Sequence, residues 1–307
     1  MLLYTHPSCL QHDPGAGHPE CPARLAAVLQ ALHEALPEVP WHEAPLADRQ
    51  CIARAHDAAL VDDLLGHPVV AQRQIDPDTA MSPASAEAAQ RAAGAVCAAI
   101  DAVIEGKSRR AFCAVRPPGH HATRQQAMGF CLFNSIAVGA LHAQQRHGIA
   151  RVAVIDFDVH HGNGTQDILW DQPGTLYVSS HQHPLYPGSG LPFERGGLGR
   201  TLNLPLDEGS DGVLFRRLWS EQLLPEIDAF APELLLISAG FDAHRLDPLA
   251  GLNLGADDYA WITERLVDLA ERHARGRVVS ALEGGYSLTA LRESSVAHVR
   301  ALMERDA

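Results

Sequence analysis

The stretch that decides the fold runs from Arg151 to Gly164 and reads RVAVIDFDVHHGNG. Its first five residues, Arg151–Ile155, form an apolar run that predicts a buried strand. Alternate side chains of an extended segment share a face, so Asp156, Asp158 and His160 are expected to point the same way. Carboxylates this close repel one another when they are buried, unless a cation lies among them. The stretch therefore predicts a strand that ends in a cation site.

Further apolar runs of strand length alternate with helical segments along the chain. These strands are expected over Ala111–Val115, Thr175–Ser179, Leu234–Ile237 and Arg277–Leu282. Helices are expected over Pro22–Leu36, Ser85–Ile104, Asn134–His147, Asp211–Phe230 and Asp257–His273, with a last one after Ser287. Apolar strands separated by helices are typical of a parallel sheet covered on both faces. No linker or shift in composition marks a boundary, so we expect one α/β domain.

The composition excludes several classes of function. Of 307 residues, 46% are hydrophobic, and 24 Lys and Arg face 37 Asp and Glu, for a formal net charge of -13. This balance argues against direct nucleic-acid binding, which needs a basic surface. No apolar run approaches the ~18–20 residues that span a bilayer, and the start MLLYTHPSCL does not read as a signal peptide. The six cysteines lack a CxxC spacing, so we expect them to act as small apolar residues in a reducing cytoplasm.

Polar side chains that do not suit a core follow four of the predicted strands. They are His120 and His121, the group Asp156 to Asn163, Asp242 with His244, and Glu283 with Tyr286. Right-handed crossovers place the C-terminal ends of parallel strands at one edge of the sheet, so these groups are expected to converge there. Asp158 and His160 then offer an oxygen and a nitrogen to a divalent metal, with Asp242 as the best third ligand. Two oxygens and one nitrogen suit zinc, and also iron(II) or cobalt(II).

Other chemistries find less support in the sequence. The sequence has no HExxH motif and no GxSxG motif. The Gly106-Lys107-Ser108 segment lacks the glycine that begins a phosphate-binding loop. No cysteine neighbours the histidine clusters in sequence, so a thiol nucleophile is unsupported. A metal-binding module without catalysis would require a broken histidine pair or a missing tyrosine. A binuclear manganese hydrolase would require further bridging ligands near Asp242, for which His244 is the candidate.

At this point the motifs resemble those of a known family, the zinc-dependent histone deacetylase superfamily. They are, in order, GHPECPARL, RPPGHHA, MGFCLFN, DFDVHHGNGTQ, YPGSG, SAGFDAHRLDPL and EGGY. The resemblance runs from Thr5 to about Ser295 and is nearest to class II and bacterial histone deacetylase-like amidohydrolases. It implies the arginase/deacetylase fold, a mostly parallel eight-stranded sheet sandwiched by helices, with residues 1–307 as one catalytic domain.

The resemblance also implies roles for individual residues. It makes Asp158, His160 and Asp242 the ligands of one zinc ion, and Asp156 and Ser179 ligands of a structural potassium or sodium ion. His121 would act as general base, His120 would supply electrostatic stabilisation, and Tyr286 would stabilise the oxyanion. Asp156 would orient His120, and Asn163 stands beside His121 where class I members have Asp. The substrate would be bound by Phe130, Tyr186, Asp78, Leu249, Gly129 and Gly284, and Arg24 would line an inner channel.

The expected activity is zinc-dependent removal of acetyl or other acyl groups from N-acyl-lysine-like amides. The substrate would be an acyl-lysine peptide or a small acylated amine. Relatives that act on polyamines place a Glu just after the Asp-Pro of the DPL segment, where this chain has Leu249. An apolar side chain there suits a free cationic polyamine poorly. Acetylpolyamine amidohydrolysis is therefore the alternative.

Overall fold

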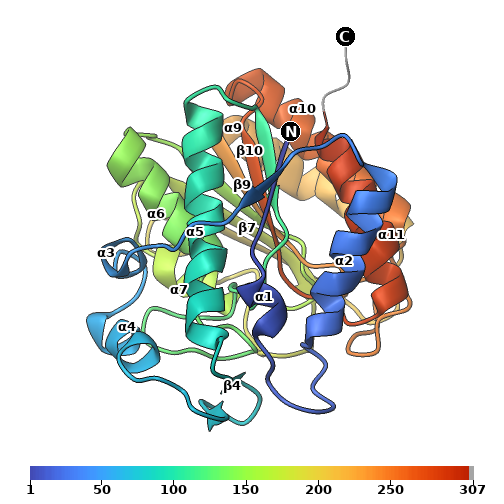
Figure 1. Ribbon diagram of the computed structural model, residues 1–307. Helices are drawn as coiled ribbons and strands as arrows, with labels where there is room; N and C mark the ends of the chain where they lie inside the picture. The colour runs from blue at the N-terminus through green and yellow to red at the C-terminus, as the bar shows by residue number, and fades with distance from the viewer. Residues whose placement is uncertain (304–307) are drawn as a thin grey trace.

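A sheet of eight strands forms the centre of the computed structural model, which describes residues 1–303. The strands follow one another in the order β2-β1-β5-β10-β9-β6-β7-β8, and every pairing is parallel. Their bounds are β1 Leu2–Thr5, β2 Trp41–Glu43, β5 Arg110–Cys113, β6 Val152–Asp156, β7 Thr175–Gln182, β8 Thr201–Leu206, β9 Leu234–Ala239 and β10 Val278–Leu282. This arrangement confirms the predicted single α/β domain with an eight-stranded sheet between helices (Figure 1).

Helices cover both faces of the sheet. The long ones are α2 Pro22–Ala35, α5 Ser85–Ile104, α6 Ser135–His147, α10 Ala256–His273 and α11 Leu288–Leu302. The short ones are α1 Ser8–Gln11, α3 Arg49–Ile52, α4 Ala58–Leu65, α7 Asn163–Leu169, α8 Gly212–Leu218 and α9 Leu224–Phe230. Helices α5 and α6 pack together on one side, and α2, α11 and α10 pack in that order on the other (Figure 1). Burial on both faces explains why the central strands are apolar throughout.

Local signals explain where helix α6 begins and ends. The side chain of Asn134 accepts a hydrogen bond of 2.9 Å from the backbone N–H of Ala137, which satisfies a free donor of the first turn. At the other end Gly148 takes a left-handed conformation with φ of 66°, which residues with a Cβ adopt at a cost. Both ends therefore lie where the sequence predicts them.

The structure differs from the sequence predictions at several elements. Residues 211–230, expected to be mostly helical, form α8, a π-helical segment η1 over Trp219–Leu223, and α9, with Pro225 in the first turn of α9. Strands β1, β2 and β8 had no counterpart among the predicted apolar runs, and neither did the small antiparallel pair β3 Arg73–Gln74 and β4 Ala80–Met81. The missed strands of the large sheet lie at or next to its edges.

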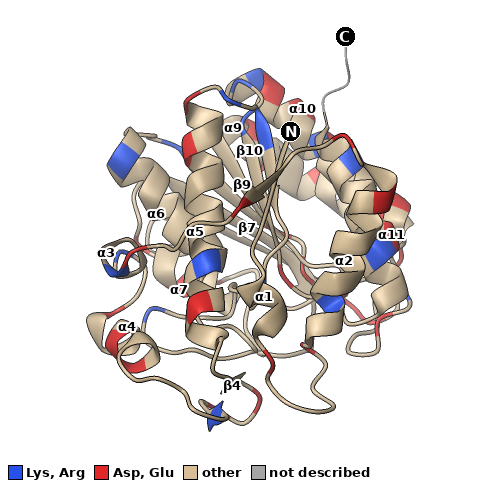
Figure 2. Ribbon diagram, in the orientation of Figure 1, with Lys and Arg blue, Asp and Glu red and all other residues tan. Residues whose placement is uncertain are grey.

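Two further observations bear on partners. Within residues 1–303, the helices are all too short or too polar to cross a lipid bilayer. In the view of Figure 2, Lys and Arg residues are scattered over separate elements, often near Asp or Glu. The expected absence of nucleic-acid binding stays a prediction.

Candidate metal and catalytic site

The polar groups that follow four strands meet at the C-terminal edge of the sheet, as the sequence predicts. The loop after β6 carries Asp158 and His160, the loop after β9 carries Asp242, and the segment after β10 carries Glu283 and Tyr286. A fourth loop, after β5, carries His120 and His121. All of these side chains are buried except that of Tyr286, which is half-buried.

Asp158, His160 and Asp242 form a compact group in which the possible ligand atoms lie within 4.8 Å of one another. Nδ1 of His160 lies 3.1 Å from Oδ1 of Asp158 and 3.2 Å from Oδ2 of Asp242. The second oxygen of each carboxylate is held by the backbone. Asp158 Oδ2 accepts a hydrogen bond from the N–H of Gly284, and Asp242 Oδ1 accepts one from the N–H of Val159, both at 2.8 Å. Each carboxylate is thus fixed with one oxygen turned toward the imidazole.

Two glycines let the backbone approach these carboxylates. A Cβ on Gly240 would lie 2.0 Å from Asp158 Oδ2, and one on Gly284 would lie 2.1 Å from Asp242 Oδ2. Any side chain at either position would push a carboxylate out of place. Gly284, for which the resemblance implies a substrate contact, therefore lies against the carboxylates of this group.

The two carboxyl groups, Asp158 and Asp242, have pKa values shifted in opposite directions. Burial and the nearby Asp158 raise the pKa of Asp242 to about 7. Burial also opposes ionisation of Asp158, but His120 and His160 lower its pKa below the ordinary value. Two carboxylates this close are more easily ionised together when a cation lies beside them. The group therefore has the charge and the donor atoms of a divalent metal site.

Asp156 lies next to Asp158, and His120 contacts both carboxylates, at 3.0 Å through Nδ1 and 3.8 Å through Nε2. Strand β6 ends at Asp156, and the next residues turn rather than continue the strand. Oδ2 of Asp156 accepts hydrogen bonds from Nδ1 of His120 at 3.0 Å and from the hydroxyl of Tyr177 at 3.2 Å. Its register partner across β7 is Ser179, whose hydroxyl pairs with His181 at 2.9 Å. The monovalent cation at these residues stays a prediction.

The two adjacent histidines differ in their partners and in their charge. Nδ1 of His121 donates a hydrogen bond of 2.8 Å to Oδ1 of Asn163, a neutral amide. Burial and the neighbouring His120 and His160 keep the pKa of His121 well below its usual value. Burial would also lower the pKa of His120, but the carboxylates of Asp158 and Asp156 raise it well above that value. At neutral pH His121 is therefore uncharged while His120 is a cation.

Glu283 holds the loop that carries the histidine pair, a role that the sequence did not indicate. Oε2 of Glu283 accepts hydrogen bonds from the backbone N–H groups of Gly119 at 2.6 Å and His120 at 3.2 Å. Oε1 accepts a hydrogen bond of 3.1 Å from the hydroxyl of Ser238. Burial raises the pKa of Glu283 to about 7. The sequence signal that could have indicated this role is the position of Glu283 directly after strand β10.

A cavity of about 250 Å³ opens above this group. It brings together most of the predicted substrate and catalytic residues, and it adds Leu185. Its lining is Asp78, His121, Gly129, Phe130, His160, Leu185, Tyr186, Leu249 and Tyr286. The ring of Tyr186 stands edge-on to His121, with ring centres 5.0 Å apart, and Phe130 stands edge-on to Tyr286 at 5.8 Å. The cavity is a mostly apolar slot with titratable groups at its floor.

A tight turn presents Phe130 to this cavity. Met128 and Cys131 exchange two backbone hydrogen bonds of 3.1 and 3.0 Å around Gly129 and Phe130, whose φ angles are 56° and 69°. Two consecutive positive φ angles are the mark of a type I′ turn, and the second costs a non-glycine residue about 1–2 kcal/mol. The Phe130 N–H donates to Oγ1 of Thr79 at 3.0 Å, which helps to hold this conformation.

A buried ion network lies beneath Tyr286. The guanidinium of Arg24 lies 4.8 Å from the centre of the Tyr286 ring and donates to the carbonyls of Gly285 and Glu283. Arg24 also pairs at 2.9 Å with Glu20, which in turn binds Arg116. The sequence singled out Arg24, whereas Glu20 and Arg116 were named only within motifs.

The chain is similar to known proteins in both sequence and structure. Residues 18–302 match the model of the histone deacetylase domain. The chain is 38% identical to the histone deacetylase-like amidohydrolase of Pseudomonas aeruginosa over 91% of this chain and 75% of that protein. It is 37% identical to the chloroplastic histone deacetylase 14 of Arabidopsis thaliana over 99% of this chain and 77% of that protein. The crystal structure of the HDA15 HD domain superposes with a TM-score of 0.93 at 35% identity, covering 98% of this chain and 88% of that one.

These matches support a deacetylase or amidohydrolase function that acts on acylated substrates. They extend over nearly the whole chain and include both sequence and structure. The chain belongs to the histone deacetylase family.

Proposed function

We propose that this protein is a zinc-dependent amidohydrolase that removes acetyl or other acyl groups from N-acyl-lysine-like amides. The observation that carries the proposal is the placement of one buried Asp-His-Asp group, with a neutral and a cationic histidine beside it, at the floor of an apolar slot. A slot of this kind accepts an aliphatic stem, and the polar floor receives the amide at its end.

The residues present fit a zinc ion. Oδ1 of Asp158, Nδ1 of His160 and Oδ2 of Asp242 would hold it, because they face one another while the remaining carboxylate oxygens are occupied by backbone donors. Three protein ligands that leave a position open are typical of catalytic zinc. When bound, the ion would supply Lewis acidity to the amide carbonyl and lower the pKa of a water molecule.

The neighbouring side chains are suited to move the protons. With Nδ1 of His121 donating to Asn163, its Nε2 carries the lone pair and can take a proton from the attacking water. The same atom can then return that proton to the leaving amine. His120, cationic through Asp156 and Asp158, stabilises negative charge nearby. Burial raises the pKa of Tyr286 well above its ordinary value, so its hydroxyl keeps its proton and can donate to the oxyanion.

The rest of the predicted assignments belong to the same proposal. Phe130 and Tyr186 would flank the substrate stem, Asp78 would bind its backbone, and Leu249 would border the entrance. Asp156 and Ser179 would hold a potassium or sodium ion that stiffens the end of β6. We also propose that residues 1–307 form one catalytic domain and that the enzyme works in the cytoplasm.

The entrance favours an acyl-lysine over an acetylpolyamine. Leu249 is an apolar side chain that lines the cavity, and a free polyamine would place an ammonium group near it. The carboxylate of Asp78, which also lines the cavity, is the feature that favours the alternative. Burial raises the pKa of this carboxyl above its ordinary value.

The test compares an acetyl-lysine peptide, lysine peptides with longer acyl groups, and N-acetylputrescine. Activity on the lysine peptides should vanish after chelation and return with added zinc, and Asp242→Ala should lose both this activity and the bound ion. Leu249→Glu should shift the ratio of kcat/KM toward N-acetylputrescine. Full activity after exhaustive chelation would refute the metal mechanism, and a preference of the unaltered enzyme for N-acetylputrescine would favour the alternative.

A further inference from the structure

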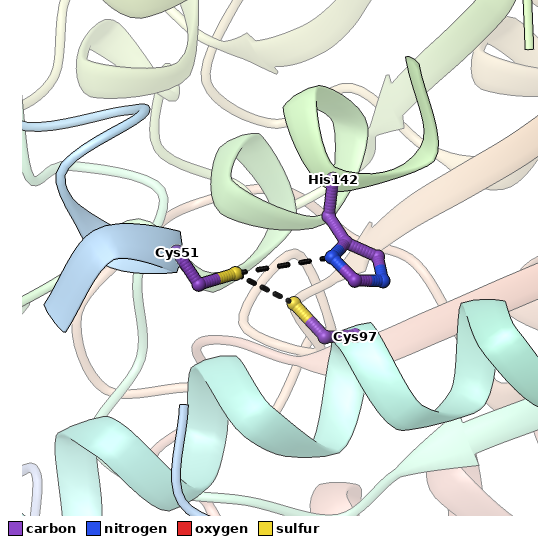
Figure 3. A group of neighbouring side chains, drawn as sticks. All are labelled: Cys51, Cys97 and His142. Carbon is purple, nitrogen blue, oxygen red and sulfur yellow. Dashed lines mark hydrogen bonds between the residues drawn. The ribbon is translucent and has the colours of Figure 1, made fainter. Parts of the chain in front are cut away.

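Three side chains that the proposed reaction does not use meet between helices on one side of the sheet. Cys51 comes from α3, Cys97 from α5 and His142 from α6. Figure 3 shows the three side chains pointing toward one another. They are buried, with 7%, 8% and 7% of their surfaces exposed. The three residues are far apart in the sequence and are brought together by helix packing, so no sequence motif predicts the group.

The distances between their donor atoms match those around a tetrahedral metal ion. With Zn–S bonds of about 2.3 Å and a Zn–N bond of about 2.05 Å, ideal tetrahedral geometry separates two sulfurs by about 3.8 Å and a sulfur from a nitrogen by about 3.6 Å. The sulfurs of Cys51 and Cys97 are 3.5 Å apart, and Cys51 Sγ lies 3.9 Å from Nδ1 of His142. All three donor atoms lie within 4.8 Å of one another. The sulfur–sulfur distance and the Cys51–His142 distance each differ from the ideal value by about 0.3 Å.

A carboxylate orients His142 as carboxylates orient metal-binding histidines. Nε2 of His142 lies 2.7 Å from Oδ1 of Asp101, which also pairs with Nε2 of His147 at 2.6 Å. A hydrogen bond from Nε2 to a carboxylate fixes the ring and leaves Nδ1 directed at the two sulfurs. This partner is an observation independent of the sulfur distances.

A cationic side chain already contacts the same donor atoms. Nη1 of Arg54 lies 3.6 Å from Sγ of Cys51 and 3.3 Å from Nδ1 of His142. Arg54 is half-buried, so its guanidinium can move away into solvent. A guanidinium only donates hydrogen bonds, so both atoms present lone pairs to it. The position of Arg54 marks a point where the group attracts positive charge.

We propose that Cys51, Cys97 and His142 form a second metal site, separate from Asp158, His160 and Asp242, that binds a thiophilic ion such as Zn²⁺. Two sulfurs and one imidazole nitrogen are the soft donors that select such an ion over Mg²⁺ or Ca²⁺. Binding would release the thiol protons and tie α3 to α5 and α6, so the site would stabilise this side of the domain. The proposal does not depend on the deacylation chemistry.

Cobalt(II), used in place of zinc, separates the two sites by spectroscopy. Thiolate ligands give Co²⁺ an intense charge-transfer band in the near ultraviolet, whereas carboxylate and imidazole ligands do not. We expect this band when the metal-free protein is titrated with Co²⁺, and we expect it to persist in Asp242→Ala. It should disappear in Cys51→Ser and in Cys97→Ser, while Cys21→Ser, at a half-buried cysteine outside the group, should retain it.

Two variants that leave both sulfurs in place test the surroundings. Asp101→Asn should weaken Co²⁺ binding at the thiolate site by about 10–100-fold, as the loss of a carboxylate partner does elsewhere. Arg54→Ala should strengthen it, because a competing cation is removed. These variants keep the proposal testable if the serine variants fail to fold.

Three results would overturn the proposal. One is the absence of the thiolate band in reduced wild-type protein that binds Co²⁺ at Asp158, His160 and Asp242. Another is that Cys51 and Cys97 fail to react with a thiol reagent in denatured, unreduced protein, which would mean that they form a disulfide. The third is a second ion that binds without the band, which would place it at Asp101, His142 and His147, the other group of donors here.

Discussion

Glu20→Gln removes the single buried carboxylate that joins Arg24, Arg116 and His12. Glu20 is fully buried. Its oxygens pair with Arg24 Nη1 at 2.9 Å and with Arg116 Nη2 at 2.7 Å, and Arg116 Nε makes a further short contact. His12 Nε2 lies 3.3 Å from the same carboxylate. Glutamine keeps the shape but turns an NH₂ group toward these donors. Breaking a buried ion pair from one side costs about 3–5 kcal/mol, and two guanidinium groups lose their partner here.

The measurement is the free energy of unfolding at pH 7 from chemical denaturation, supported by calorimetry. At about 1.6 °C per kcal/mol for a chain of this length, Tm should fall by roughly 5–8 °C. Glu87→Gln is the matched control, because the Glu87 side chain is half exposed and its pair with Arg91 should contribute less than about 0.5 kcal/mol. A loss below about 1 kcal/mol in Glu20→Gln would refute the reasoning that this charge holds the network together.

The dependence on pH adds a second check on the same variant. Burial alone would raise the pKa of Glu20, but Arg116 and His12 hold it well below the ordinary value of 4.5. A carboxyl with a depressed pKa in the folded state stabilises the protein above its unfolded pKa, and this contribution is lost as pH falls through the folded value. The difference in stability between wild type and Glu20→Gln should therefore be constant near neutral pH and narrow below about pH 4.5. A gap that widens in acid would contradict the assignment.

Three further predictions concern catalysis. Tyr286→Phe should lower kcat by about 10²–10³-fold with unchanged metal content, since it removes one oxyanion donor; near-normal turnover would exclude the hydroxyl from the reaction. Asn163→Asp should raise the pKa of His121, so the acidic limb of the kcat/KM profile should move to higher pH, and an unmoved limb would argue against His121 as the base. Gly129→Ala places a Cβ 2.6 Å from the His121 ring, at a backbone φ of 56°. The displaced ring should lower kcat/KM by roughly tenfold or more while the bound metal remains. Unchanged kinetics would show that the reaction tolerates displacement of the ring.

The interior of the fold could be predicted from the sequence, whereas its edges could not. Strands β6, β9 and β10 are buried on both faces, so they read as continuous apolar runs. Strand β2 has only three residues, with polar side chains exposed at the edge of the sheet. Strand β8 contains Pro205, which lacks a backbone donor and is tolerated because β8 forms the other edge. Edge strands therefore carry weak or contrary signals.

The same distinction holds for the candidate site. Asp158, Asp242 and His121 were found because they follow buried strands, by two, three and eight residues, so topology alone brings them together. Asp156 ends β6, and although the chain bends after it, its carboxylate stays in contact with the Asp158 backbone N–H. The pairing of Cys51 with Cys97 depends on how three helices pack, which no local pattern encodes.

The histidine pair shows how tertiary partners, rather than residue type, divide the work of the proposed reaction. His120 and His121 are adjacent and both buried, and their ring centres are 4.0 Å apart. Like charges this close repel, so a single cation between the two rings is the favoured state. The carboxylate of Asp156 assigns that charge to His120, and the neutral amide of Asn163 leaves His121 free to accept a proton. Because Glu283 holds the backbone of His120, this division of charge is built into the loop before any substrate binds.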